Sequence, residues 1–233
     1  MPPRARWAVV AVLCAALGVA VVVAGQPGEP PPVAGVARLG PEAGEPVADY
    51  LRRAGASLPA ARSGPPVWAL VQLQGYLAPE PAAELTQGVR LSRVVLRVPL
   101  PRVQTALITS DLPGQRPAAE LTEVLRSAAQ GRTAVASREV PGGRPAAVAT
   151  AEAEQLRAGC ACVVALLVFG DSAALHAVAS RPGVRVVHAA APDTPLQDVA
   201  ISPLLPEQIE LAAPVPDDGA VAPDLVQESP GYR

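Results

Sequence analysis

The sequence predicts an α/β (α+β) fold: a mixed domain behind an N-terminal transmembrane helix. Two observations predict it. Residues 7–25 form an apolar stretch without a charge, and two later segments, residues 67–98 and 162–190, each pass through a strand, a helix and a second strand. The 233 residues suffice for one such domain and its membrane span.

The membrane span follows a short stub, residues 1–6, which carries Arg4 and Arg6. As a helix, residues 7–25 would extend about 28 Å, close to the hydrocarbon thickness of a bilayer. Positive charge precedes the span, and an acidic, proline-rich stretch follows it. The positive-inside rule therefore predicts a single-pass protein of the cell membrane, with its N-terminus in the cytoplasm, membrane lipid around residues 7–25 and an extracytoplasmic body.

A cleaved signal peptide is the alternative, because Val23, Ala24 and Gly25 offer small residues at a plausible cleavage position. The apolar region of a signal peptide usually has about 7 to 15 residues, and this one is longer. The length favours an uncleaved signal anchor. Cleavage would make the protein secreted, and both alternatives export the body of the chain.

After the span, residues 26–45 are rich in proline and glycine and predict an extended linker. From Pro46 onward, four residues recur at helical spacing and predict a short amphipathic helix: Val47, Tyr50, Leu51 and Ala54.

Two similar units follow the helix. Each begins with an apolar run of strand length, at residues 67–73 and 162–169, and continues through an alanine-rich helical stretch. Each then resumes at Gly-Val-Arg, from Gly88 or Gly183, with a β-branched run. Strands joined through one helix lie parallel, either as neighbours or on both sides of an inserted strand. Two such units predict a ferredoxin-like β-α-β / β-α-β domain over residues 46–213, and a different α/β sheet is the alternative.

Between the units, the pattern predicts a strand at residues 103–108 and two helices. The first helix starts at Pro117 and is expected to stop at Gly131, and the second ends at Gly159. Beyond the second unit, residues 202–211 can pack one short apolar stretch back on the body. Residues 214–233 are acidic and proline-rich, which predicts a disordered tail.

Composition excludes one class of partner. All 19 basic residues are arginines, because the sequence contains no lysine, and a GC-rich bacterial genome explains this bias. The net charge is −2 and only 3% of the residues are aromatic. Nucleic-acid binding needs clustered basic residues, so no nucleic-acid partner is predicted.

Cys160 and Cys162 form the most suggestive chemical pair, since Cys14 lies within the predicted span. On a regular strand their Cα atoms would be about 6.5 to 7 Å apart, at the upper limit for a disulfide. A bridge would therefore need a bend in the chain. The pair predicts either a thiol-redox or soft-metal site, or two structural cysteines, of which the second is favoured.

The tripeptide from Gly170 to Ser172 lies between a strand and a helix. It resembles the nucleophile block of GDSL-type hydrolases over these three residues alone, and the later Asp-x-x-His of that family is missing. We therefore expect Asp171 or Ser172 to cap the helix. His176 and His188 are likewise expected to be structural.

Four arginines cluster on the return strand of the first unit: Arg90, Arg93, Arg97 and Arg102. Alternation places Arg93 and Arg97 on one face of the sheet, opposite Val94 and Leu96. A solvated face is the simpler interpretation. The functional interpretation is contact with an anionic ligand, with a partner, or with the acidic tail of this or another chain.

No nucleophile–base pair, metal cluster or cofactor motif stands out, so the sequence predicts no cofactor and does not favour an enzyme. It favours a membrane-anchored extracytoplasmic module that binds an envelope or membrane protein. The alternative is an exported thiol-redox or metal-handling protein that uses Cys160 and Cys162, and a hydrolase ranks third.

Overall fold

The computed structural model describes residues 36–58 and 64–221. The predicted stub, the predicted transmembrane helix at 7–25, most of the predicted linker and residues 222–233 of the predicted tail lie outside these ranges. Within them, no helix combines the length and the hydropathy that a membrane crossing requires.

Helices and strands are interspersed along the described chain. The helices are α2 (Val47–Ala56), α3 (Pro79–Glu84), α4 (Pro117–Ala136), α5 (Arg144–Arg157), α6 (Ser172–Ala179) and the 3-10 turn η1 (Leu196–Asp198). The strands are β1 (Ala37–Leu39), β2 (Val67–Leu77), β3 (Arg90–Leu96), β4 (Ile108–Asp111), β5 (Val163–Gly170), β6 (Val184–Ala189) and β7 (Val199–Ile201). Strand β3 is followed directly by β4, and helix α4 by α5.

The main sheet has the strand order β4-β3-β5-β2-β6, and every neighbouring pair is antiparallel. Strands β2 and β3 both pair with β5, so they run parallel to each other with β5 between them. Strands β5 and β6 likewise lie on either side of β2. Each strand–helix–strand unit is thus split by a strand of the other, and the prediction of a mixed α/β domain is confirmed.

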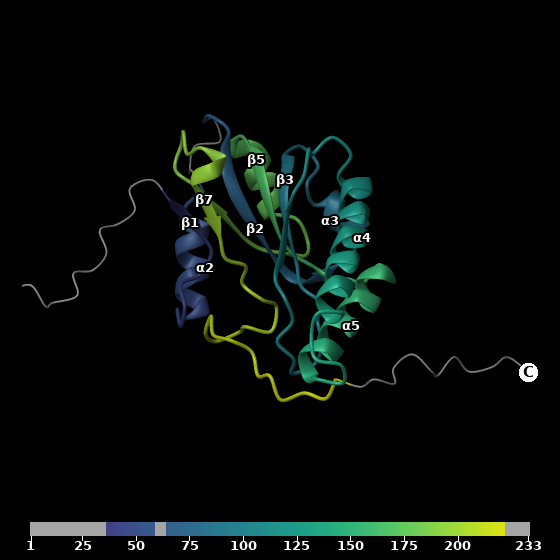
Figure 1. Ribbon diagram of the computed structural model, residues 1–233. Helices are drawn as coiled ribbons and strands as arrows, with labels where there is room; N and C mark the ends of the chain where they lie inside the picture. The colour runs from purple at the N-terminus through teal and green to yellow at the C-terminus, as the bar shows by residue number, and fades with distance from the viewer. Residues whose placement is uncertain (1–35, 59–63, 222–233) are drawn as a thin grey trace, which may run out of the picture. The chain divides into compact units, whose positions relative to one another are not determined.

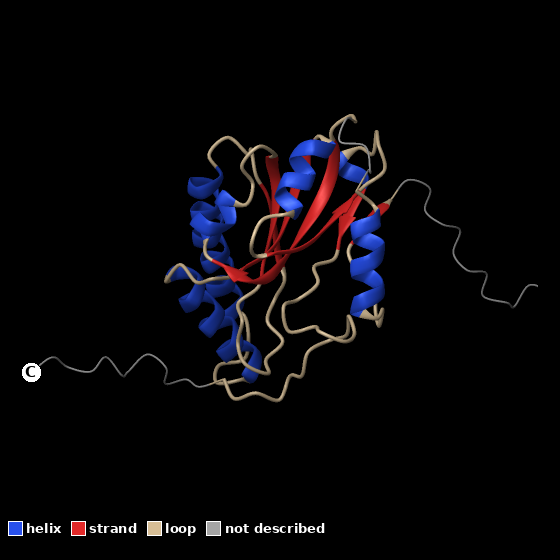
Figure 2. Ribbon diagram, turned by 180° about the vertical axis from the view of Figure 1, so that it is seen from behind, coloured by secondary structure: helices blue, strands red, loops and turns tan. Residues whose placement is uncertain are grey.

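Both faces of this sheet are covered, which explains why the central strand β5 and the first five residues of β2 are apolar without interruption. Along β2, Val67, Ala69 and Val71 pack under the helices, whereas Trp68 and Leu70 face the opposite layer. Figure 2 shows α3 to α6 gathered on and beside one face of the strands. Their buried side chains share one core with the sheet.

The second face is covered by short elements, of which the sequence predicted the helix α2 but not the strands β1 and β7. Strands β1 and β7 form a parallel pair, and α2 packs beside β6. Residues 203–221, here named the C-terminal strap, then run from β7 past the near face of the sheet to the start of α5 at Arg144 (Figure 1). The apolar stretch predicted to pack back does so, because Leu204 and Leu205 are buried.

Several predicted boundaries shift. Strand β1 lies inside the stretch assigned to the linker, and strap residues 214–221 lie in the stretch assigned to the tail. The strand expected at residues 103–108 is found instead at Ile108–Asp111. Helix α4 continues through Gly131 to Ala136. Its buried leucines and alanines all precede the glycine, and α4 also packs along α5.

Candidate functional site

A hollow of about 910 Å³ lies between α4 and α5, next to the start of α3. Helix α5 follows α4 after a short turn and packs along it. Buried side chains, Leu125, Ala129 and Leu156, form the apolar floor of this helix groove. Small residues on the outer side of α4, such as Ala134, leave the groove open.

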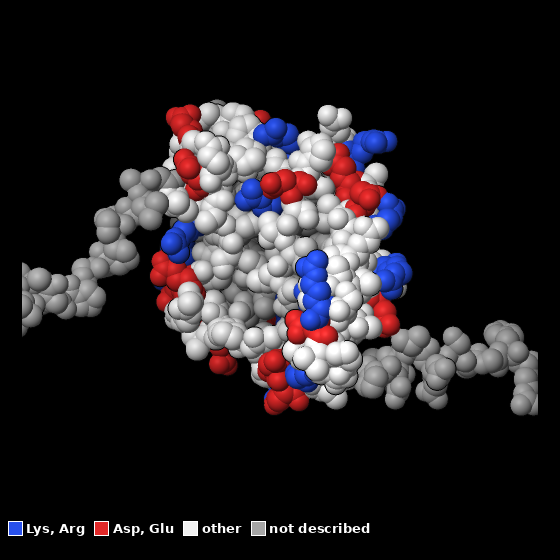
Figure 3. Space-filling model, in the orientation of Figure 1, with Lys and Arg blue, Asp and Glu red and all other residues white. Residues whose placement is uncertain are grey.

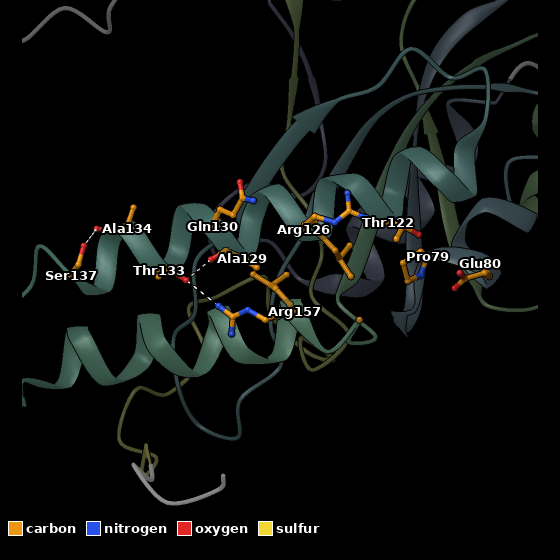
Figure 4. A pocket seen from close by; sticks show the side chains of 13 residues that line it. Pro79, Glu80, Thr122, Arg126, Ala129, Gln130, Thr133, Ala134, Ser137 and Arg157 are labelled. Atoms are coloured by element: carbon orange, nitrogen blue, oxygen red, sulfur yellow. Dashed lines mark hydrogen bonds between the residues drawn. The ribbon is translucent and has the colours of Figure 1, made fainter.

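The rim of the helix groove is polar (Figure 4). The Arg157 guanidinium donates to the Thr133 hydroxyl across the groove at 3.3 Å. Arg126 is exposed on the same rim and pairs with Glu123 one turn earlier, while Glu80 lies at the α3 end. An apolar floor with charged groups around it suits a peptide that presents an apolar side chain beside a carboxylate.

The two candidate cysteines lie at one end of the helix groove and form a disulfide. Their Cα atoms are 5.3 Å apart, because the chain bends at Ala161 before β5 begins. This is the bend that a bridge was expected to require. Cys162 is completely buried and Cys160 is partly buried, and Gly159, which lines the groove, directly precedes Cys160.

Arg93 and Arg97 lie on the strap side of the sheet, whereas Val94 and Leu96 belong to the core under the helices. The alternation predicted for this strand is confirmed. This face is not solvated, however, because the Arg97 side chain is only 3% exposed.

The structure does not bring the two arginines to a common partner. Arg93 donates to the Asp111 carboxylate at 2.5 Å on the neighbouring strand. Arg97 forms an ion pair with Glu207 of the strap and also donates to the Tyr76 hydroxyl at 2.5 Å and to the Val103 carbonyl at 3.2 Å. Burial raises the pKa of the Tyr76 hydroxyl to about 12, so it remains protonated.

A second cavity of about 400 Å³ adjoins Arg97 under the strap. Proline and aliphatic side chains line most of it, including Leu100 and Val215, while Arg97, Tyr76 and Glu207 provide its polar part. The strap thus roofs a mixed cavity against the loop after β3.

The strap ends on a cluster of charged residues that the sequence predicted in part, because contact of Arg102 with the acidic tail was one of the interpretations of its arginine cluster. Asp217 contacts Arg144 at the start of α5, and Asp218 contacts Arg102 in the loop after β3. Oppositely charged side chains lie side by side at this end of the domain, at the lower right of Figure 3. The contact of Arg144 with Asp217 could not be predicted in the same way, because α5 and the strap are far apart in the sequence.

Asp171 and His188 form structural hydrogen bonds, as expected. Asp171 accepts a hydrogen bond from the Ala174 backbone N–H at 2.8 Å, which confirms that it caps α6. His188 accepts one from the Gly40 N–H at 3.0 Å, and burial lowers the pKa of its imidazole to about 4. Among residues 36–58 and 64–221, no three His, Cys, Asp or Glu side chains are placed to share a metal ion.

Comparison with known proteins found no family model, no curated protein and no solved structure that matches this chain.

Proposed function

We propose that this chain is a membrane-anchored module whose extracytoplasmic domain binds a peptide segment of an envelope or membrane protein in the helix groove. The anchor and the orientation rest on the uncharged residues 7–25 behind Arg4 and Arg6. The binding role rests on the groove itself, and that is the observation that carries the proposal.

We also assign the domain to the ferredoxin-like sandwiches. The strand order β6-β2-β5-β3, with two split β-α-β units, supports this assignment. Strand β4, helices α4 and α5, and the layer over the second face are then additions to that core. The groove lies on the added helices, and additions of this kind are where a shared fold acquires its own function.

The helix groove has the features of a peptide site. Its volume falls within the usual range for ligand pockets, about 300 to 1,000 Å³. The floor at Leu125 and Leu156 offers apolar atoms for an inserted side chain to contact. Arg126 and Arg157 add positive charge on the rim, which favours a partner side chain that is a carboxylate.

Photocrosslinking in native membranes tests this proposal. A photoreactive amino acid at Gln130, on the rim, should form one discrete adduct with a membrane or envelope protein. The adduct should disappear when Ala134→Trp fills the groove, because the two positions lie one turn apart on α4. The matched control is Ser127→Trp, an exposed position on α4 outside the groove, which should leave the adduct intact.

Two results would contradict the proposal: an adduct that survives the groove-filling variant, or one that both tryptophan variants abolish equally. Circular dichroism of both variants should match that of the wild type, which separates loss of binding from loss of folding.

A thiol-redox protein is the second candidate, because Cys160 and Cys162 are bridged and Cys160 is partly accessible. In this reaction a dithiol partner would reduce the bridge: two partner thiols become a disulfide, and the two cysteines become thiols. The reduced pair could also offer two thiolates to a soft metal such as Cu(I). Equilibration of the full chain in glutathione buffers decides this, since a potential below about −300 mV marks a structural bridge.

A further inference from the structure

We propose that the loop 98–107 and the start of α5 form a second docking surface, for an extended acidic peptide of a partner protein, and that the strap occupies this surface in the free molecule. The proposal is independent of the helix groove, because it uses the opposite side of α4 and α5.

The strap binds its surface through carboxylates, as a ligand would. The Asp218 carboxylate accepts from two nitrogens of Arg102, at 2.7 Å from Nε and 2.5 Å from Nη2. The Asp217 carboxylate accepts from the Gln104 backbone N–H at 3.0 Å and from Arg144 at 2.9 Å. Two-pronged arginine contacts select carboxylates by geometry as well as by charge.

Main-chain contacts fix the direction of the strap. Gln104 donates through its side-chain amide to the Val215 carbonyl at 2.7 Å, and the Gly219 N–H donates to the Arg102 carbonyl at 2.7 Å. The Arg144 guanidinium also donates a hydrogen bond to the Gly219 carbonyl at 2.7 Å. These bonds use main-chain atoms of the strap and do not depend on the strap's side chains. Another chain with the same spacing can therefore make them.

The position after the two aspartates must be glycine. A Cβ atom on Gly219 would lie 2.2 Å from the Pro101 carbonyl oxygen, which is a clash with backbone. The surface therefore recognises two adjacent carboxylates followed by glycine. Val215, which roofs the cavity beside Arg97, indicates an apolar residue shortly before them.

Two further observations indicate that a partner peptide can replace the strap on this surface. Arg102 adopts a positive φ of 54°, which is uncommon for a residue with a side chain and places strain in the recognition loop. The ion pairs are also open to solvent: side-chain exposure is 61% for Arg102 and 64% for Asp218. Exposed pairs are weak and screened by salt, so a competing acidic segment can displace the strap.

The Arg102 guanidinium, through its hydrogen bonds, holds the pKa of Asp218 below its usual range, and the Gln104 N–H and Arg144 do the same for Asp217. Both carboxylates are therefore charged at neutral pH. The strap competes only at the local concentration set by its tether, which is of millimolar order for a short flexible link. A partner that makes additional contacts elsewhere on the domain can bind tightly enough to displace the strap.

A peptide with the sequence of residues 214–221 tests the proposal against the purified full chain. In the wild type the strap should block the peptide. In the double variant Asp217→Asn, Asp218→Asn the surface should be open, and the labelled peptide should bind about tenfold more tightly by fluorescence anisotropy. This binding should weaken steeply between 50 and 500 mM salt. Gly219→Ala should open the surface by steric conflict instead of charge, with the same result.

The controls remove one partner at a time. Adding Arg102→Gln to the opened variant should abolish peptide binding, and a peptide with asparagines in place of both aspartates should not bind. Asp49→Asn breaks an exposed pair with Arg52 on α2 and should leave the wild-type behaviour unchanged. Equal peptide affinity in wild type and opened variants would overturn the proposal, as would a wild type that dimerises by exchanging straps.

Discussion

The Nδ1 atom of His188 accepts a hydrogen bond from the backbone N–H of Gly40, although the two residues are 148 positions apart in the chain. The bond joins the last strand of the main sheet to the turn after β1. It requires a neutral imidazole, because a protonated Nδ1 has no lone pair to accept the hydrogen. Arg53, Glu45 and the Tyr50 ring surround His188, and burial has the largest effect on its pKa.

Stability should therefore fall in mild acid. The pKa of His188 is about 4 in the folded domain and about 6.5 when unfolded, so the unfolded chain binds the proton more tightly. The contribution of this group is complete above pH 6.5 and is lost as the pH falls towards 4. Urea unfolding at a series of pH values should show this loss, and His188→Gln, which keeps an acceptor that does not titrate, should flatten the curve between pH 4 and 6.5. An unchanged slope in the variant would assign the acid sensitivity to other groups.

Gln72 should be the most costly polar residue to replace. It is completely buried, donates to the Tyr50 hydroxyl at 3.0 Å and to the Ser202 carbonyl at 3.1 Å, and accepts from the Leu204 N–H at 2.9 Å. Gln72→Leu removes the partner of two buried groups and one partly buried group, and should cost at least about 2 kcal/mol in the free energy of unfolding. Tyr50→Phe removes one of these bonds and should cost about 1 kcal/mol. Equal costs in chemical denaturation would contradict this ranking.

The double variant Cys160→Ala, Cys162→Ala should fold and should be only moderately less stable. A bridge that closes so short a loop restricts the unfolded chain little, and the loop-entropy relation gives about 1.5 kcal/mol. Calorimetry of the oxidised wild type and the variant, both in a Cys14→Ser background, measures the difference. A loss above about 4 kcal/mol in the free energy of unfolding would show that the bridge also stabilises contacts outside its own turn.

Phe169 should contribute less than a residue of the central core. Its ring stacks on Trp68 at 4.7 Å and lies under the Arg90 guanidinium, yet it is only partly buried. Phe169→Ala should cost about 2 kcal/mol, below the about 3 to 5 kcal/mol typical of a fully buried phenylalanine. Leu166→Ala, at a completely buried position on the same strand, serves as the comparison and should cost more.

Cell fractionation tests the anchor predicted from the sequence. The native protein should sediment with membranes, and protease added outside intact protoplasts should digest the body. Full protection would reverse the predicted orientation. A released protein that begins near Gln26 would identify the stretch as a cleaved signal peptide.

The central strands and the longer helices could be predicted because each carries its own signal. Strand β5 is a continuous apolar run that ends at Gly170, β2 begins with five apolar residues, and α2 shows four apolar residues at helical spacing. Strands β1 and β7 could not be predicted, since three residues contain no period and each strand is defined by a partner far away in sequence. Gly131 was misleading because its intrinsic cost of about 1 kcal/mol is smaller than the gain from packing α4.

The candidate sites also differ in how far the sequence could predict them. The Cys160–Cys162 pair could be recognised because both residues lie in one short motif. The helix groove could not, because its floor is made by Leu125 and Leu156 of different helices, which ordinary amphipathic patterns also explain. The docking surface of the strap could be predicted in part. Contact of Arg102 with the acidic tail was one alternative, but its partner Asp218, 116 residues away, is identified only in the folded domain.

The covering of the second sheet face has a consequence for biogenesis. A ribosome delivers β1 first and the strap last, and β1 has no strand to pair with until β7 has been made. Until then, Trp68 and Leu70 lack the layer that shields them from water. A nascent chain therefore passes through a stage in which one side of a nearly complete sheet is uncovered and prone to aggregate. Truncations near residue 200 should depend on a chaperone, whereas the full-length chain should not.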